Sequence, residues 1–131
     1  SDGVECEPLR VALADERGEV AVMLEGQPQM EVGCHTDVMD SCPKSVAIPM
    51  LLRSANPQII AVDEITQARD LVAMEEAAYC GVRFLATLHA DSADDLHRRP
   101  LLQKLQKMHL FEKAITIHMA DTLRRYTIRD L

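Results

Sequence analysis

Short, continuous apolar runs separated by segments of helical periodicity constrain the fold of this chain more than any other feature. The runs end in polar residues and lie at positions 10–14, 59–62, 82–88 and 114–119. Runs without alternation are typical of strands that are buried on both faces, as in parallel sheets. The order strand, helix, strand therefore predicts an α/β domain in which right-handed crossovers build a parallel sheet.

The segments between these runs predict the helices and turns. Residues 68–80 carry apolar side chains at helical spacing and are followed by Gly81, which can end a helix. Residues 100–108 begin with proline and place three leucines on one face, and Pro43 can open a helix that contains Pro49. A short polar link after residue 119 predicts an antiparallel hairpin with residues 126–129, at one edge of the sheet. Residues 24–42 show no clear periodicity and are expected to form a loop.

Size and charge exclude several classes of function. The chain has 131 residues, enough for one domain, and a net charge of −7 at pH 7. Aromatic residues make up only 3%, so the basic and stacking surfaces of nucleic-acid binders are missing. No secretory signal or membrane-length apolar run is visible. Four cysteines without a C-x-x-C pair predict reduced, mostly buried thiols of a cytosolic protein.

Polar residues follow the predicted strands and are expected to meet at one rim of the sheet, where α/β proteins bind ligands. These residues are Asp15, Glu16, Asp63, Glu64, Thr87 and His89. Carboxylates gathered in this way attract a cation such as Mg²⁺. The run IIAVDE at 59–64 has the form of a Walker B strand, in which the aspartate holds Mg²⁺ through water and the glutamate orients the attacking water. Thr87 and His89 could sense the γ-phosphate or hydrogen-bond the glutamate.

A plainer interpretation stays open, because two acids after an apolar strand often only mark the return of the chain to solvent. The sequence also contains no G-x-x-x-x-G-K-[ST] loop, so no segment is evident that would grip the phosphates. We therefore expect this chain by itself to bind neither ATP nor Mg²⁺ tightly. Cys34, His35 and Cys42 suggest zinc only weakly, since a fourth ligand at suitable spacing is missing.

Several stretches resemble the ATPase core of the stage III sporulation protein AA family, which is related to the type II and type IV secretion motor ATPases. They are LADER at 13–17, VGCHTDVMDSCPK at 32–44, LLRS at 51–54, IAVDEI at 60–65 and LATLHA at 85–90. The resemblance covers nearly the whole chain. It departs from the family pattern at His35, where arginine is usual, at Thr66, where glycine is common, and at Pro49, where methionine is common.

The resemblance implies a parallel, three-layer P-loop NTPase-like sheet that lacks its first strand and ends in a β-hairpin. Residues 1–131 would be the C-terminal part of an ATPase core, with the Walker B strand and the preceding acidic box but no Walker A loop. Asp63 would be the Mg²⁺-associated acid and Glu64 the catalytic glutamate. Asp15, Glu16 and Arg17 would form the acidic box that contributes to nucleotide binding, and His89 would belong to the histidine box, near Thr87.

The family also implies what the parent protein does. It would hydrolyse ATP as a ring, expected to be a hexamer, and energise the channel between mother cell and forespore through membrane-embedded sporulation proteins. It would lie in the cytoplasm on the mother-cell side. The present chain, as a piece cut after the Walker A helix, would be inactive. Loss of the first strand would open the edge at 82–88, to be closed by residues 114–119 or by dimerisation of the chain.

Two other classes of function remain as alternatives. A receiver-like phosphoacceptor domain would share the acidic pair Asp15 and Glu16, the aspartate Asp63 and the threonine Thr87. It also needs a lysine after the last strand, whereas residues 120–123 read ADTL. A non-catalytic interaction domain would tolerate the loss of Asp63 and Glu64 without loss of function.

Overall fold

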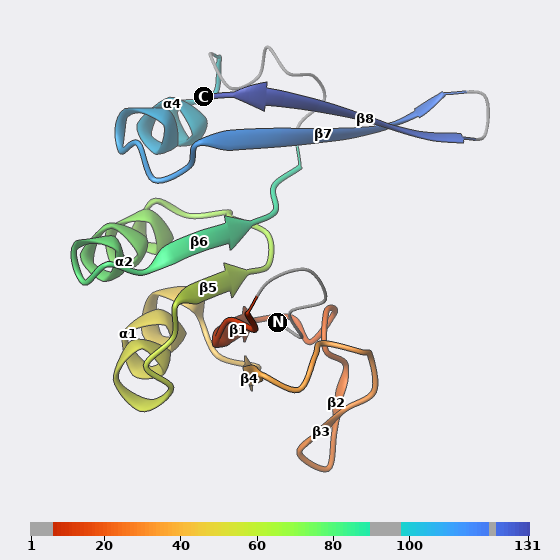
Figure 1. The fold of residues 1–131 in the computed structure, drawn as a ribbon. Helices are drawn as coiled ribbons and strands as arrows, with labels where there is room; N and C mark the ends of the chain where they lie inside the picture. Colours follow the sequence, from red (N-terminus) through yellow and green to blue (C-terminus); the bar gives the residue numbers. More distant parts are fainter. Residues whose placement is uncertain (1–6, 90–97, 121–122) are drawn as a thin grey trace. The chain divides into compact units, whose positions relative to one another are not determined.

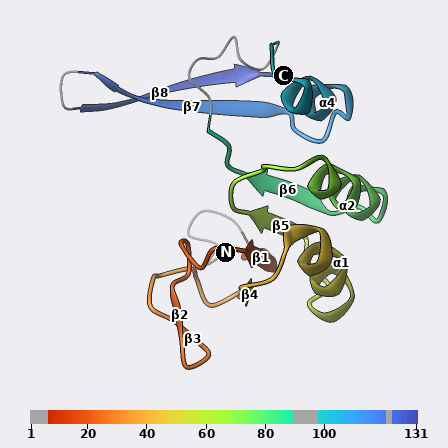
Figure 2. The ribbon, with the colours of Figure 1, turned by 180° about the vertical axis from the view of Figure 1, so that it is seen from behind.

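The chain folds into two compact units in a computed structural model, residues 1–89 and residues 90–131 (Figures 1 and 2). The structure describes residues 7–89, 98–120 and 123–131. The first unit contains every described residue of the predicted rim.

A four-stranded parallel sheet forms the first unit, in the order β4-β1-β5-β6. Its strands are β4 (Thr36–Asp40), β1 (Val11–Asp15), β5 (Ile59–Val62) and β6 (Arg83–Ala86). The register places Leu13 of β1 beside Val38 on one side and Ala61 on the other. The apolar runs at 10–14, 59–62 and 82–88 therefore form parallel strands, which confirms the predicted α/β class.

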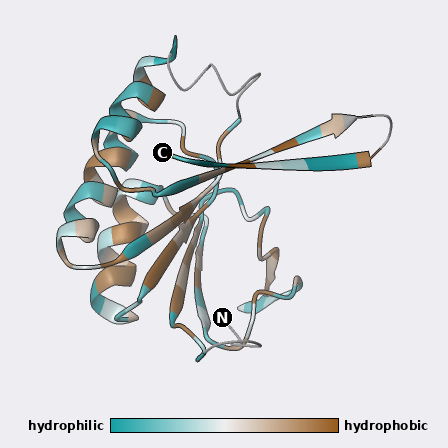
Figure 3. Cartoon of the chain, turned by 45° about the horizontal axis from the view of Figure 1, so that its top comes forward, coloured by the Kyte–Doolittle hydropathy of each residue, from teal (hydrophilic) through white to brown (hydrophobic). Residues whose placement is uncertain are grey.

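Two helices, α1 (Lys44–Ser54) and α2 (Ala68–Tyr79), pack side by side against one face of this sheet (Figure 3). They share a face because both crossovers, from β4 to β5 and from β5 to β6, run in the same direction across the sheet. Ile48, Ile60, Leu71 and Met74 are fully buried between the layers. A capping box, in which Gln67 and Asp70 bond each other's backbone, starts α2.

The segment 24–42 is more structured than its sequence predicts. It contains part of a small antiparallel pair, β2 (Met23–Leu24) and β3 (Gln27–Pro28), and the whole of β4. The expectation of a loop over these residues is therefore wrong at β4. This strand is half exposed at the edge of the sheet, so it lacks the apolar run that identified the buried strands.

The second unit consists of helix α4 (Pro100–Lys107) and a hairpin of β7 (Lys113–Ala120) and β8 (Leu123–Asp130). Proline occupies the first turn of α4 and Leu102 and Leu105 are buried, as the leucine spacing predicts. The antiparallel hairpin is also confirmed. It forms a two-stranded sheet of its own among the described residues, and closure of the edge at β6 by residues 114–119 stays a prediction.

Two further observations bear on the sequence predictions. Cys34 and Cys80 are exposed and Cys42 is partly exposed, so the expectation of mostly buried thiols is wrong for the described cysteines. Cys6 lies outside the described residues.

In the part of the chain that the structure describes, no helix has the length and apolar character needed to cross a bilayer.

Candidate functional site

The carboxyl ends of the central strands bring the predicted acids to one edge of the sheet. β1 ends at Asp15, Asp63 directly follows β5, and Thr87 directly follows β6. The register aligns these ends, because Ala14 lies beside Val62 and Val62 beside Ala86. The fold therefore brings together the strand ends that the sequence predicts to form one rim.

Lys44, the first residue of α1, ties this rim together. Its Nζ lies 2.7 Å from Oε2 of Glu16 and 2.8 Å from Oδ1 of Asp63. The backbone N–H of Lys44 also donates to Oε2 of Glu16, at 3.4 Å. The Lys44 side chain is only 4% exposed, so this is a buried ammonium held by two carboxylates from different loops.

The pairing changes the proton affinity of two of these groups. The hydrogen bond from Lys44 lowers the pKa of Glu16 below its ordinary value of 4.5, against the opposing effect of burial. Burial alone would lower the pKa of Lys44, but its hydrogen bonds to Asp63 and Glu16 outweigh burial and raise that pKa above 10.5. Both groups are consequently charged at neutral pH.

Asp15 has a different partner set. Its carboxylate is fully buried and accepts three backbone N–H bonds, from Glu19 at 3.0 Å, Val20 at 3.0 Å and Ala21 at 2.8 Å. The turn between them closes through a bond from the Gly18 N–H to the Asp15 carbonyl, with Gly18 at a φ of 67°. Asp15, predicted to bind nucleotide, thus anchors the loop that presents Glu16 and Arg17.

Arg17 contacts both acids of the IIAVDE run. Its backbone N–H donates to Oδ2 of Asp63 at 3.3 Å, and its guanidinium lies 3.3 Å from Oε2 of Glu64. Asp63 is buried, whereas Glu64 keeps about a quarter of its side chain exposed (26%). Glu64 is therefore the acid with access to solvent, and Asp63 is the acid fixed by the protein.

Thr87 and His89 lie on the segment that leaves β6, and both are exposed. The backbone of Thr87 extends the pairing of β5 and β6, since its N–H donates to Val62 and its carbonyl accepts from Ile65. This pairing keeps Thr87 next to the segment that carries Asp63 and Glu64. Their predicted roles toward phosphate and Glu64 stay predictions.

The fit of this rim to Mg²⁺ depends on Asp63. One carboxylate oxygen of Asp63 accepts from Lys44 and the other from the Arg17 N–H. Within the described ranges, no group of three or more His, Cys, Asp or Glu side chains could hold a metal ion, which includes Cys34, His35 and Cys42. Each oxygen can still accept another hydrogen bond, so the residues fit Mg²⁺ held through its bound water.

Lys44 is the site residue that sequence reasoning did not single out. Its signal is present in the sequence, because Lys44 directly follows Pro43 and opens a helix whose first turn contains no acid. A cation at that position is disfavoured by the helix dipole, so it needs anionic partners from elsewhere. Those partners, Glu16 and Asp63, are 28 and 19 residues away and become visible only in the fold.

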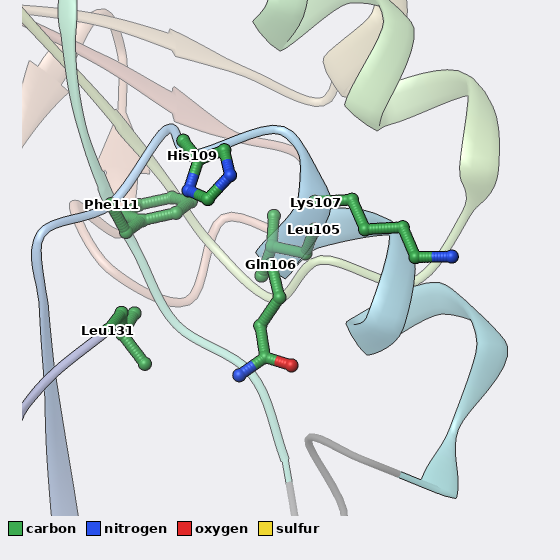
Figure 4. A pocket seen from close by; sticks show the side chains of 6 residues that line it. All are labelled: Leu105, Gln106, Lys107, His109, Phe111 and Leu131. Carbon is green, nitrogen blue, oxygen red and sulfur yellow. The ribbon is translucent and has the colours of Figure 1, made fainter.

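The second unit contains a pocket of about 310 Å³. Figure 4 shows the residues that line it, both apolar and polar: Leu105, Gln106, Lys107, His109, Phe111 and Leu131. None of the rim carboxylates belongs to this lining. The residues that the sequence predicts for catalysis and metal binding are therefore not part of this pocket.

Comparisons with known proteins identify a family and a curated relative of this chain. Residues 1–127 match the family described as Sporulation stage III, protein AA. Stage III sporulation protein AA of Bacillus subtilis (strain 168) is 36% identical over 113 residues, which are 86% of this chain and 37% of that protein. The chain thus spans little more than a third of the length of this curated relative.

A solved structure has a similar fold. The crystal structure of the pilus retraction motor PilT with bound ADP matches with a TM-score of 0.59 and 14% identity. The match covers 95% of this chain and 39% of that one. At this identity the likeness concerns the fold.

Proposed function

Because the chain belongs to the sporulation stage III protein AA family, we propose that its rim is the metal-and-water half of an ATP-hydrolysing site. The observation that carries this proposal is the pair of adjacent acids after β5, of which Asp63 is buried and fixed while Glu64 is partly exposed. ATP hydrolysis needs one acid to hold the cation and another to orient water. The two environments match this division of labour.

In this proposal, Mg²⁺ supplies a positive charge that stabilises the phosphate oxygens as they gain negative charge. Asp63 would hold the ion through its bound water, and Glu64 would accept a hydrogen bond from the attacking water. Arg17, which pairs with Glu64 at 3.3 Å, keeps that carboxylate at the rim. Thr87 and His89 line the neighbouring segment, where they can contact the phosphate.

The 131 residues include no glycine-rich phosphate loop, so nucleotide binding needs a further segment. We propose that ATP is gripped by such a segment elsewhere in the whole protein, and that the chain alone binds ATP and Mg²⁺ weakly and is inactive. As in the family-based expectation, the protein would work as a ring, expected to be a hexamer. It would act from the mother-cell cytoplasm on membrane-embedded partners of a sporulation channel.

The test measures ATP turnover by the whole protein that carries these residues. Glu64→Gln is expected to lower turnover by about 10²- to 10⁴-fold while leaving ATP affinity nearly unchanged, because the amide cannot accept a proton but keeps the shape. Asp37→Asn, at an exposed carboxylate of β4, is the matched control and should retain the original rate. A Glu64→Gln variant that turns over ATP at that rate would refute the proposal.

The contact between Lys44 and Asp63 also favours a second candidate, the phosphoacceptor domain. That reaction needs a lysine beside the acceptor aspartate, and α1 supplies one although the segment after β7 does not. Acetyl phosphate distinguishes the two candidates. Covalent labelling of Asp63 in the isolated chain, detected by mass spectrometry, would support the phosphoacceptor, and its absence is expected for the ATPase half-site.

A further inference from the structure

We propose that the ammonium of Lys44 is the resident cation of the rim and keeps divalent ions out of direct contact with Asp63. This inference deepens the proposed function, since it concerns the carboxylate assigned to Mg²⁺, but it can be tested without nucleotide. It makes Lys44 a positioning residue that acts through Asp63 and Glu16.

Burial of the Lys44 side chain indicates a specific requirement for a charge there. Lysine is almost never fully buried unless it is paired, because transfer of its charge out of water is costly. Lys44 is 3% exposed overall and also opens helix α1, whose N-terminal dipole disfavours cations. Among the described residues, the carboxylates of Glu16 and Asp63 offset both unfavourable effects.

The Lys44 ammonium occupies the position that an ion coordinated directly by Glu16 and Asp63 would need. Nζ lies within hydrogen-bonding distance of one oxygen of Glu16 and one oxygen of Asp63. The remaining oxygen of Asp63 is bonded to the Arg17 N–H. A divalent ion that bound Oδ1 of Asp63 directly would have to displace the Lys44 ammonium and leave its buried charge with Glu16 alone, which is unfavourable.

Exclusion of direct contact has a consequence for the site. Lys44 holds Asp63 in one orientation before any nucleotide arrives, so the carboxylate is already placed to accept hydrogen bonds from the water shell of Mg²⁺. The same ammonium also compensates the negative charge of the Glu16 carboxylate, so the rim stays assembled in the absence of a metal ion. The affinity for divalent ions then comes mainly from the phosphates.

The first experiment follows Mn²⁺ binding to the isolated chain by electron paramagnetic resonance. Lys44→Met is expected to bind Mn²⁺ about tenfold more tightly or better than the original chain, because two carboxylates lose their internal counter-ion. Lys44→Arg should bind no more tightly than the original, because the positive charge remains. Lys104→Met removes an exposed lysine of α4 and is the matched control.

Adding Asp63→Asn to Lys44→Met should abolish the gain, which a purely structural role of Lys44 would not predict. If Lys44→Met folds, as judged by circular dichroism, and binds Mn²⁺ no better than the original chain, the inference is wrong. Tight Mn²⁺ binding by the original chain that requires Asp63 would also overturn it.

A second experiment needs no variant and so does not depend on the folding of one. Lysine-selective ¹⁵N NMR of the original chain observes the Lys44 ammonium directly, and Lys44→Arg assigns its signal. Millimolar Mg²⁺ should leave the signal and its hydrogen exchange unchanged. A Mg²⁺-dependent shift or accelerated exchange of that signal would show displacement and contradict the inference.

These outcomes are separate from those of the proposed function. Failure of Glu64→Gln to slow ATP turnover would refute the hydrolytic role and leave the Mn²⁺ and NMR results standing. Displacement of Lys44 by Mg²⁺ would refute the present inference and leave the hydrolytic role untouched.

Discussion

Individual carboxylates at the rim have different tasks even where they are neighbours in the sequence, as in the pairs Asp15–Glu16 and Asp63–Glu64. Asp15 holds the backbone of its own loop, Glu16 and Asp63 share the ammonium of Lys44, and Glu64 pairs with Arg17 near solvent. Adjacent residues of one type thus receive different partners, because each points from the chain in a different direction. Substitutions at these positions should have correspondingly different effects.

Loss of the Asp15 carboxylate should weaken the fold. Asp15→Ala leaves three backbone N–H groups without their acceptor, so we expect the free energy of unfolding to fall by about 2–4 kcal/mol. Urea denaturation followed by circular dichroism measures this change. Asp37→Ala removes an exposed carboxylate and should alter stability by less than about 0.5 kcal/mol. Equal effects of the two substitutions would contradict the anchoring role of Asp15.

The pairing of Glu16 with Lys44 should make stability depend on acid pH. The pKa of Glu16 is lowered in the folded state, so its contribution is present above about pH 4.5 and is lost as the pH falls through the folded pKa. Arg69 acts on Glu16 in the same direction as Lys44. Glu16→Gln should flatten this part of the stability profile, measured by urea denaturation between neutral and acid pH. An unchanged profile would show that the pair contributes no net stability.

At the scale of elements, helix α1 begins with a residue of the candidate site and contains a proline in its interior, which is unfavourable for a helix. Lys44 opens the helix at the rim, whereas Pro49 lies inside it and lacks the N–H that a helix needs. The helix is maintained by burial of Ala47, Ile48 and Leu51 against its neighbours. Tertiary packing therefore outweighs the local preference at Pro49.

Replacement of the proline should stabilise this helix. Pro49→Ala restores a backbone hydrogen bond, and after the greater freedom of the unfolded chain is subtracted we expect a gain of about 1–3 kcal/mol. Chemical denaturation measures the gain, and Met50→Ala, at a half-exposed position of the same helix, serves as the control. A Pro49→Ala variant that is less stable than the original would mean that the helix is adapted to the proline.

The elements differ in how far their sequence predicts them. Buried strands such as β5 were predictable, because a strand covered on both sides needs an uninterrupted apolar run. The edge strand β4 was not, because none of its residues is fully buried and it lacks an uninterrupted apolar run. The rim itself followed from the strand ends. Lys44 did not, because a buried charge is defined by partners that only tertiary structure brings to it.

At the scale of the whole molecule, β6 is an edge strand of the parallel sheet in the first unit. Arg83 and Thr87 donate their N–H groups to Gln58 and Val62, so the N–H of Ala86 points away from β5, to the side on which the described part of the first unit has no further strand. Leu85 on this strand is 64% exposed. Such an edge can pair with another copy of the chain.

We therefore expect concentration-dependent self-association of the chain through β6. Ala86→Pro removes an outward N–H and leaves the bonds to β5 in place, so it should reduce association measured by sedimentation velocity. Ala68→Pro is the matched control, because proline is tolerated at the first position of α2. A chain that stays monomeric at every concentration, or one that associates equally with Ala86→Pro, would contradict this role of the edge.

The division of labour between Asp63 and Glu64 is tested most directly by the Mg²⁺ dependence of ATP hydrolysis in the whole protein. Asp63→Asn should raise the Mg²⁺ concentration for half-maximal hydrolysis by about tenfold or more. Glu64→Gln should leave that concentration unchanged and lower only the maximal rate. If both variants changed the maximal rate alone, or if neither changed hydrolysis, the assignment of Asp63 to the ion and Glu64 to water would be wrong.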